Sequence, residues 1–358
     1  MSTSRAAAPD IARGLCLALI AVANATWWLG ERDPHTWWDR AVDLLLAVTV
    51  DGRVYPLFVF LLGYGITQFL SRGRPGQSRA LLRRGAVMVV LGLFHGVLLW
   101  QGDVLAAYGM LTVLALLILV PRSTRTLWWL SGLMGASTAV VAVTMSLLPG
   151  VTSESSSWAL LTSTDAVRAL GARVSYWATN SFLSPLMPSI TLPLVLGLVS
   201  ARHRLLEDVQ RHRDLLMVLL AAAPVGWISG VLLWSLDDAS LWLLDAVVGM
   251  LTAAGYVAAL ALLSLRADLP GVQALGRNSM TGYLIQSVAL VPLLAPWALG
   301  LSLQLGELEV VALALLVWAA TLLWARARLR DASPSGYRRG PFERLVRWVM
   351  WPSAVRSR

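Results

Sequence analysis

The chain has 358 residues, of which 57% are hydrophobic and only 14% are charged, and its formal net charge is +9. This apolar content exceeds what one soluble core can bury, so it excludes an ordinary soluble domain and indicates an all-α, polytopic transmembrane helical bundle. The basic residues stand in short segments between apolar runs, so the positive charge follows membrane topology and does not predict a nucleic-acid partner.

The residue types also exclude some chemistry. Every one of the 29 basic residues is arginine, so no lysine is present to form a Schiff base or to act as a general base. The single cysteine, Cys16, lies in the first apolar run, which excludes an internal disulfide and a cysteine metal cluster. We therefore expect no metal centre.

Ten apolar runs predict membrane spans. They lie near residues 11–29, 54–71, 85–100, 104–121, 126–148, 182–200, 215–234, 241–264, 279–299 and 306–325. The loop after the second run holds five arginines and no acid, whereas the segment before that run is rich in aspartate. Arginine-rich loops face the cytoplasm. The sequence thus predicts about ten spans in a bacterial inner membrane, with both termini cytoplasmic.

This arrangement predicts four parts of the chain. Residues 1–148 form a five-span half, residues 149–181 an external excursion, residues 182–330 a second five-span half, and residues 331–358 a cytoplasmic amphipathic tail. An alternative for the N-terminus is a cleaved signal peptide, because arginines precede an apolar run that contains small residues. The run continues through an interfacial tryptophan pair at 27–28, which favours a retained helix.

Three segments outside the runs have an apolar face at helical spacing. Residues 36–54 are too charged to span and predict an external interfacial helix or part of a lid. Residues 160–174 predict a helix that could roof a cavity. The segment GPFERLVRWVMWP, residues 340–352, predicts a cytoplasmic surface helix anchored by Trp348 and Trp351.

Prolines and glycines mark two of the apolar runs. Pro185, Pro188 and Pro193 predict that the sixth span is broken or bent. Gly63-Tyr64-Gly65 invites comparison with a potassium filter, but it lies within an apolar helical pattern. That context favours close helix packing over a filter.

The stretch RALLRRGAVMVVLGLFHGVLLWQGDVLAAYGM, residues 79–110, is the best candidate for chemistry. It places His95 within an apolar run and Asp103 after a turn at Gln101-Gly102. A histidine in hydrocarbon or in a protein-lined cavity is costly unless something uses it or pairs with it. His95 could equally be a packing histidine, and Asp103 could merely end a hairpin. Asp245 and Gln286 raise the same question less strongly.

Five segments carry a family resemblance. They are PDIARGLCLALIAVAN, DGRVYPLFVFLLGYGI, RRGAVMVVLGLFHGVLLWQGDVLAAYGML, LGRNSMTGYLIQS and YRRGPFERLVRWV. In their order and spacing, the chain resembles the YeiB-like family of bacterial inner-membrane proteins from about residue 9 to residue 350. The first half is similar to transmembrane acyltransferases, including heparan-α-glucosaminide N-acetyltransferases and polysaccharide O-acyltransferases. The resemblance implies a helical bundle that takes an acyl group from cytoplasmic acyl-CoA and transfers it to an acceptor beyond the membrane.

The chain departs from those enzymes at one place. In the polysaccharide O-acyltransferases a histidine stands about three turns after the arginine that opens the first span, whereas Arg13 is followed there by Asn24. An amide cannot act as a general base at neutral pH. Either the base has moved to His95, or acyl transfer is lost or different. His35 lies where the heparan-type enzymes carry their histidine, but its spacing does not match.

The leading hypothesis is acyl-CoA-dependent transfer across the membrane. His95 would act as the base, Asp103 would orient the imidazole or bind the acceptor, and Asn24 would donate to the developing oxyanion. The predicted contacts to CoA phosphates are Arg13, Arg83, Arg84 and Arg277. The predicted substrate contacts are Asp51, Tyr64, Tyr108 and Gln286.

Two other classes of function stay open. In a transporter or exporter the same polar groups would line a path, with His95 as a proton relay. A non-catalytic membrane protein would bind lipid headgroups through its cytoplasmic arginines. The sequence leaves open whether the acceptor is a small molecule, a glycan or a lipid, and it does not decide the oligomeric state.

Overall fold

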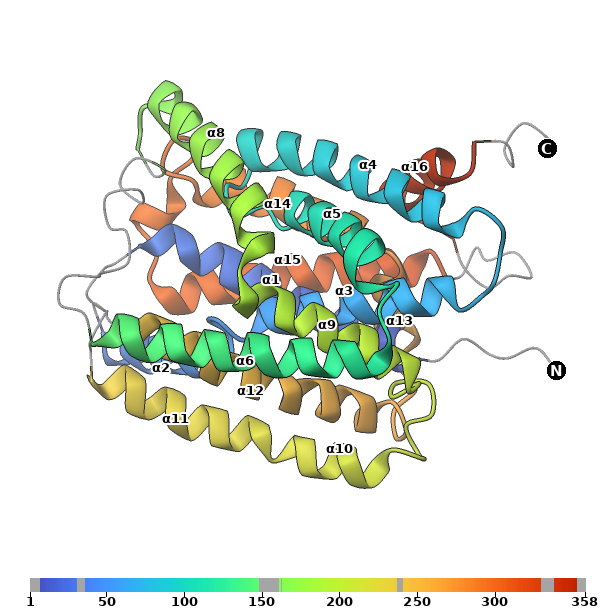
Figure 1. The fold of residues 1–358 in the computed structure, drawn as a ribbon. Helices are drawn as coiled ribbons and strands as arrows, with labels where there is room; N and C mark the ends of the chain where they lie inside the picture. The colour runs from blue at the N-terminus through green and yellow to red at the C-terminus, as the bar shows by residue number, and fades with distance from the viewer. Residues whose placement is uncertain are drawn as a thin grey trace.

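The computed structural model describes residues 7–30, 36–147, 161, 163–236, 241–329 and 338–352. His35 and most of the segment 149–162 lie outside these residues. The described part is helical throughout, and most of its helices run side by side along one direction (Figure 1).

Within the part of the first half that the structure describes, there are six α-helices. Their bounds are α1 (Ala8–Thr26), α2 (Trp37–Thr49), α3 (Val54–Leu70), α4 (Gln77–Leu98), α5 (Leu105–Leu114, continued by Ala115–Leu119) and α6 (Thr124–Ser146). Helix α2 begins with a capping box, in which Thr36 and Asp39 each accept a hydrogen bond from the other's backbone N–H. The predicted interfacial helix at 36–54 is thus a separate helix, and it packs on α11 and α15.

The second half contains nine α-helices within the described residues. Their bounds are α8 (Ala166–Leu183), α9 (Pro188–Arg202), α10 (Arg213–Leu220), α11 (Ala222–Leu236), α12 (Trp242–Leu263), α13 (Pro270–Arg277), α14 (Ser279–Leu294), α15 (Glu307–Ala327) and α16 (Pro341–Met350). A proline begins each of α9, α13 and α16. The backbone N–H groups of a helix's first turn have no acceptor within the helix, so the missing N–H of proline costs no hydrogen bond there.

Seven helical stretches of the described residues are long and apolar enough to cross a membrane, with α2–α3 and α10–α11 each taken as one stretch. The count is up to eight if α8 and α9 form one span bent by 55°. This bend confirms the break expected from the prolines. The predicted spans near 104–121 and 279–299 are shorter apolar helices, Leu105–Leu119 and Ser279–Leu294. The second of these has 16 residues, about 24 Å against a hydrocarbon core of about 30 Å. The multi-pass all-α class is therefore confirmed, whereas the count of ten and the side of the termini stay predictions.

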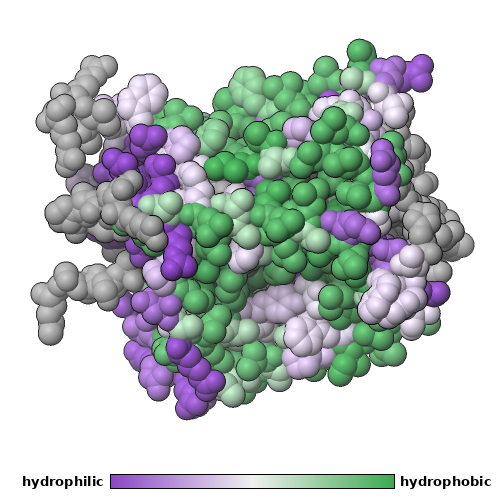
Figure 2. Space-filling model, turned by 180° about the vertical axis from the view of Figure 1, so that it is seen from behind, coloured by the Kyte–Doolittle hydropathy of each residue, from purple (hydrophilic) through white to green (hydrophobic). Residues whose placement is uncertain are grey.

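The surface has the distribution that lipid contact requires. A band of hydrophobic residues crosses the middle, and hydrophilic residues gather most strongly at one end, on the left of Figure 2. Large apolar side chains such as Trp129 and Leu133 on α6 and Ile228 on α11 are exposed. Exposed apolar area on this scale is typical of a protein surrounded by lipid.

Glycines allow α3 and α9 to pack closely. A Cβ atom at Gly63 would collide with the Leu194 carbonyl, and one at Gly197 would collide with the Phe60 carbonyl. Small residues let helix backbones approach in this way. The packing interpretation of Gly63-Tyr64-Gly65 is thereby confirmed.

The tail helix α16 is anchored by the protein itself. Val346 and Met350 are buried against Ala80 of α4. The Glu343 carboxylate accepts hydrogen bonds from Thr281 N (3.0 Å) and Thr281 Oγ1 (2.5 Å). Trp348 is exposed. The predicted helix is present, but its apolar face packs on α4 and α14 because these helices offer an apolar surface at the end of the bundle.

Candidate functional site

A buried histidine on α4 lies at the centre of the candidate site. His95 is 2% exposed. Its Nδ1 lies 2.9 Å from Asp103 Oδ1, and its Nε2 lies 2.9 Å from Ser287 Oγ of α14. Asp103 reaches His95 because the chain turns back at Gln101-Gly102, so that α5 packs along α4.

Asp103 is held rigidly in the turn before α5. Its Oδ1 also accepts a hydrogen bond from Leu105 N (3.1 Å), and its Oδ2 accepts one from Ala106 N (2.8 Å). A Cβ atom at Gly92 would collide with this carboxylate, so the glycine makes room for it. An ionised carboxylate only accepts hydrogen bonds, so it holds the proton of His95 on Nδ1. Nε2 is then free to accept from the Ser287 hydroxyl.

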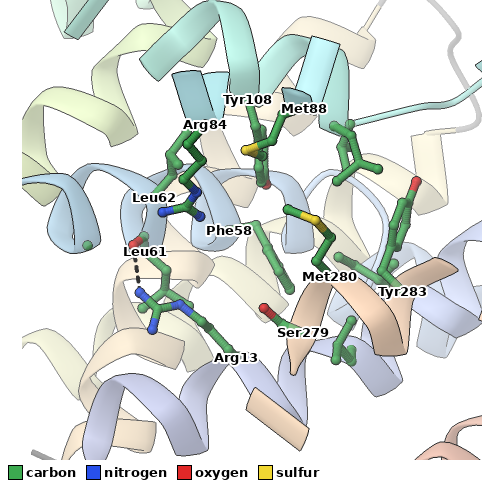
Figure 3. A pocket seen from close by; sticks show the side chains of 15 residues that line it. Arg13, Phe58, Leu61, Leu62, Arg84, Met88, Tyr108, Ser279, Met280 and Tyr283 are labelled. Atoms are coloured by element: carbon green, nitrogen blue, oxygen red, sulfur yellow. Dashed lines mark hydrogen bonds between the residues drawn. The ribbon is translucent and has the colours of Figure 1, made fainter. Parts of the chain in front are cut away.

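A cavity of about 90 Å³, the inner cavity, lies between α1, α3, α4, α5 and α14. Figure 3 shows Arg13 and Arg84 entering it from opposite walls, with Phe58 and Met280 between them and Tyr283, and with Tyr108 near Arg84. Two tyrosines thus line the inner cavity. These are Tyr108, whose buried hydroxyl has no hydrogen-bond partner in the described part of the chain, and Tyr283. The Tyr283 ring packs 4.9 Å from the His95 ring, which connects the inner cavity with the histidine.

A second cavity of about 320 Å³ adjoins the inner cavity, and we call it the arginine basin. The two share the lining residues Arg13, Gly65, Arg84, Ser279 and Met280. Helix α16 forms one wall of the basin. The arginines that line it are Arg13, Arg72, Arg84, Arg277, Arg339 and Arg347.

A buried acid organises part of the basin. Asp10 is fully buried and accepts from Arg277 Nε at 3.0 Å and from Arg13 Nη1 at 3.5 Å. Arg13 Nη2 also donates to the Leu61 carbonyl at 3.3 Å (Figure 3). Arg83 lies elsewhere: it is exposed and donates to the Met350 carbonyl at 3.3 Å. The structure thus brings together three of the four arginines predicted for CoA.

A third, small space lies beside Ser287, the hydroxyl partner of His95, and we call it the outer cavity. Its volume is about 10 Å³, enough for about one water molecule. Asn24, Gln286 and Ser287 line it together with Trp28 and Trp100. His95 itself is not among the lining residues of either the inner or the outer cavity, so Ser287 is its link to the outer one.

Sequence reasoning missed Ser287. The residue lies in the segment LGRNSMTGYLIQS, but a lone serine in an apolar helix carries no signal of its own, because such hydroxyls often bond to the preceding turn. Ser287 Oγ does lie 3.3 Å from the Tyr283 carbonyl. Only the packing of α14 against α4 reveals the shorter contact with His95.

The two other predicted substrate contacts lie away from these cavities. Tyr64 accepts from Leu206 N at 2.8 Å and donates to the Glu207 carboxylate, so it fastens α3 to the loop after α9. The Asp51 carbonyl accepts from Arg53. Fully buried Arg53 also makes two hydrogen bonds to the Asp245 carboxylate, at 2.5 and 2.6 Å. Asp245 therefore has a structural partner.

No group of three or more His, Cys, Asp or Glu side chains that could hold a metal ion occurs among the described residues. The donor set of the site is instead one imidazole, one carboxylate, one hydroxyl and several guanidinium groups. Such a set suits proton transfer and the binding of anions.

Comparison with known proteins gives relatives but no activity. Residues 200–353 match a family described as "Protein of unknown function (DUF418)". The chain is 25% identical over 348 residues to "Uncharacterized protein YxaH" of Bacillus subtilis (strain 168), covering 88% of this chain and 82% of that protein. It is 28% identical over 370 residues to "Uncharacterized protein YeiB" of Escherichia coli (strain K12), covering 91% of this chain and 88% of that protein. No solved structure matches the chain.

Proposed function

We propose that this multi-pass membrane protein, whose residues 200–353 match the DUF418 family, is a transmembrane acyltransferase that moves an acyl group from acyl-CoA to an acceptor hydroxyl or amine. The observation that carries the proposal is the position of His95. The residue is held between Asp103 and Ser287. Tyr283, whose ring packs on His95, lines the inner cavity, and Ser287 lines the outer cavity.

The arginine basin is the proposed entrance for the donor. Guanidinium groups bind phosphate with paired, charge-assisted hydrogen bonds, and CoA carries three phosphates. The arginine-rich end would face the cytoplasm, where acyl-CoA is made, in agreement with the positive-inside rule. The inner cavity, about 90 Å³ and lined by Phe58, Met88 and Met280, has room for several water molecules. It therefore suits a thioester with a short acyl chain.

His95 is the proposed general base. An acceptor hydroxyl or amine in the outer cavity gives its proton to Ser287 Oγ while Ser287 passes its own proton to His95 Nε2. The acceptor atom attacks the thioester carbonyl, the carbon–sulfur bond breaks, and the leaving thiolate receives the proton that His95 has taken up. Asp103 stabilises the imidazolium that exists between these two transfers.

The oxyanion of the tetrahedral intermediate requires hydrogen-bond donors. The Asn24 side chain lines the outer cavity, so its amide is one proposed donor. The Tyr108 hydroxyl is buried at the inner cavity and has no partner among the described residues. It is the second proposed donor, and removing one such donor costs about 10²- to 10³-fold in turnover.

The competing transporter hypothesis uses the same His95 as a proton relay, but it needs no CoA site. The convergence of six arginines on a cavity that leads toward His95 favours acyl transfer. CoA binding therefore separates the two functions.

The experiment is a calorimetric titration of the purified, full-length protein with CoA. We expect micromolar-range affinity that weakens as salt rises, because exposed arginine–phosphate contacts are screened. Arg84→Gln should weaken binding about tenfold or more, equivalent to about 1.4 kcal/mol. Arg83→Gln is the matched control, since it removes the same charge one residue away and outside the basin. Folded protein that does not bind CoA would favour the transporter.

A further inference from the structure

Several buried N–H groups without acceptors gather at the end of the bundle opposite the arginine basin. They come from the end of α4 and the turn after it, from α8, and from the segment after α14, which lie together at one end (Figure 1). We call them the donor cluster. Its members are Trp100, Gln101, Arg173, Trp177 and Trp297.

Each member has at least one buried nitrogen without a hydrogen-bond partner in the described part of the chain. These atoms are Nε1 of the three tryptophans, Nε2 of Gln101, and Nε and Nη1 of Arg173. Arg173 is only 4% exposed and Gln101 only 1%. About nine-tenths of buried polar groups in folded proteins are paired, so this concentration of unpaired donors is itself a signal.

Ring contacts join the donor cluster to the outer cavity. The Arg173 guanidinium carbon lies 4.3 Å from the Trp297 ring. Trp297 lies 6.4 Å from Trp28, and Trp28 lies 5.2 Å from Trp100. Trp28 and Trp100 both line the outer cavity, as does Ser287. The cluster thus leads from Arg173 to the hydroxyl that contacts His95.

A second contact joins the cluster to the α4 helix beside the histidine. Trp177 lies one turn after Arg173 on α8, and its indole rests on Gly96, where a Cβ atom would collide with the ring. Arg173 and Trp177 are both buried on the same side of α8, and Trp177 contacts α4 at Gly96, one residue after His95.

Arg173 needs an anion. The Trp297 ring gives it a cation–π contact, but Nε and Nη1 still have no hydrogen-bond partner in the described part of the chain. A buried cation without a counter-charge is strongly unfavourable, and Arg173 makes no ion pair with a carboxylate of the described residues. A partner that fits these donors carries negative charge and accepts several N–H bonds, as a carboxylate or phosphate does.

We infer that the donor cluster binds the anionic group, carboxylate or phosphate, of the acceptor. Resting on the proposed acyl transfer, this identifies the acceptor class as an anionic molecule that also carries a hydroxyl or an amine. The anion is held at Arg173, and the nucleophilic group points through the outer cavity toward Ser287. The outer cavity admits only this small group.

The test measures binding in the absence of CoA. Purified full-length protein is titrated with glucuronate, glucose 1-phosphate and glucose, which share a sugar ring but carry a carboxylate, a phosphate and no charge. We expect at least one anionic probe to bind and glucose to bind at least tenfold more weakly. The comparison of the two anions shows which group the cluster prefers.

Matched variants locate the site. Arg173→Gln should weaken the anionic probe at least tenfold, whereas Arg168→Gln should leave its affinity unchanged, because Arg168 is exposed on the same helix and pairs with Asp165 at 3.4 Å. Trp297→Phe keeps an aromatic ring beside Arg173 but removes the indole N–H, so it should weaken binding a few-fold. This variant decides the question if Arg173→Gln does not fold. Equal binding of glucose, no binding of either anion, or unchanged affinity in a folded Arg173→Gln or Trp297→Phe protein overturns the inference.

The outcome is independent of acyl transfer. Anion binding that depends on Arg173 without any turnover of acyl-CoA would keep the binding site and remove the proposed enzymatic function. Turnover of acyl-CoA by protein that binds neither anion would keep the proposed enzymatic function and remove the anion-binding site.

Discussion

Asp103→Asn is the most informative single change, because it alters one atom of a fully described set of contacts. In the native protein Asp103 Oδ1 accepts from His95 Nδ1 and Leu105 N, and Oδ2 accepts from Ala106 N. An asparagine side chain has one oxygen and one NH₂ group, so one of these two positions must lose its acceptor.

Both orientations of the new amide damage the base. With NH₂ at the Oδ1 position, the amide donates to His95 Nδ1, so Nε2 carries the ring proton and cannot accept from Ser287. With NH₂ at the Oδ2 position, the tautomer survives, but the charge that stabilises the imidazolium is gone and Ala106 N–H is unpaired. We expect turnover to fall by about 10² to 10⁴ and stability to fall by about 1–3 kcal/mol, the cost of one unsatisfied buried donor.

The assay follows release of the CoA thiol from acetyl-CoA in the presence of cell-envelope extract, normalised to the folded fraction from thermal unfolding. Asp165→Asn is the control, because the Asp165 carboxylate also accepts from two backbone N–H groups at the start of a helix but is exposed and contacts no histidine. It should leave turnover unchanged. Wild-type turnover per folded Asp103→Asn molecule would refute the assignment of His95 as the base.

Two further predictions concern stability and topology. Asp245→Asn leaves the fully buried Arg53 guanidinium without its counter-charge. The free energy of unfolding should therefore fall by about 3–5 kcal/mol, whereas the affinity for CoA should not change. A fall of less than about 1 kcal/mol would contradict the structural role of this ion pair. Because Cys16 is buried, single cysteines can report topology: in intact cells an impermeant thiol reagent should label Gln304→Cys but not Ser71→Cys. Labelling of Ser71→Cys alone would reverse the proposed orientation.

Features that depend on neighbouring residues were predictable from the sequence. The multi-pass helical class follows from apolar length, and the 55° bend between α8 and α9 follows from closely spaced prolines. The contact of His95 with Asp103 was within reach because the two lie eight residues apart with a turn between them. In each case the physical cause acts over a few residues of chain.

Tertiary structure decided the rest. Ser287 meets His95 across 192 residues of sequence, and no local pattern encodes that contact. Arg83 and Arg84 look alike in sequence, but adjacent residues on a helix point about 100° apart, and only packing shows that Arg84 faces the cavities while Arg83 faces α16. Arg173 falls in a segment that composition describes as an external excursion, yet α8 packs on α4 and α5 and buries its guanidinium. Which side of a helix is enclosed depends on the neighbours that the whole fold supplies, and the candidate site depends on that choice.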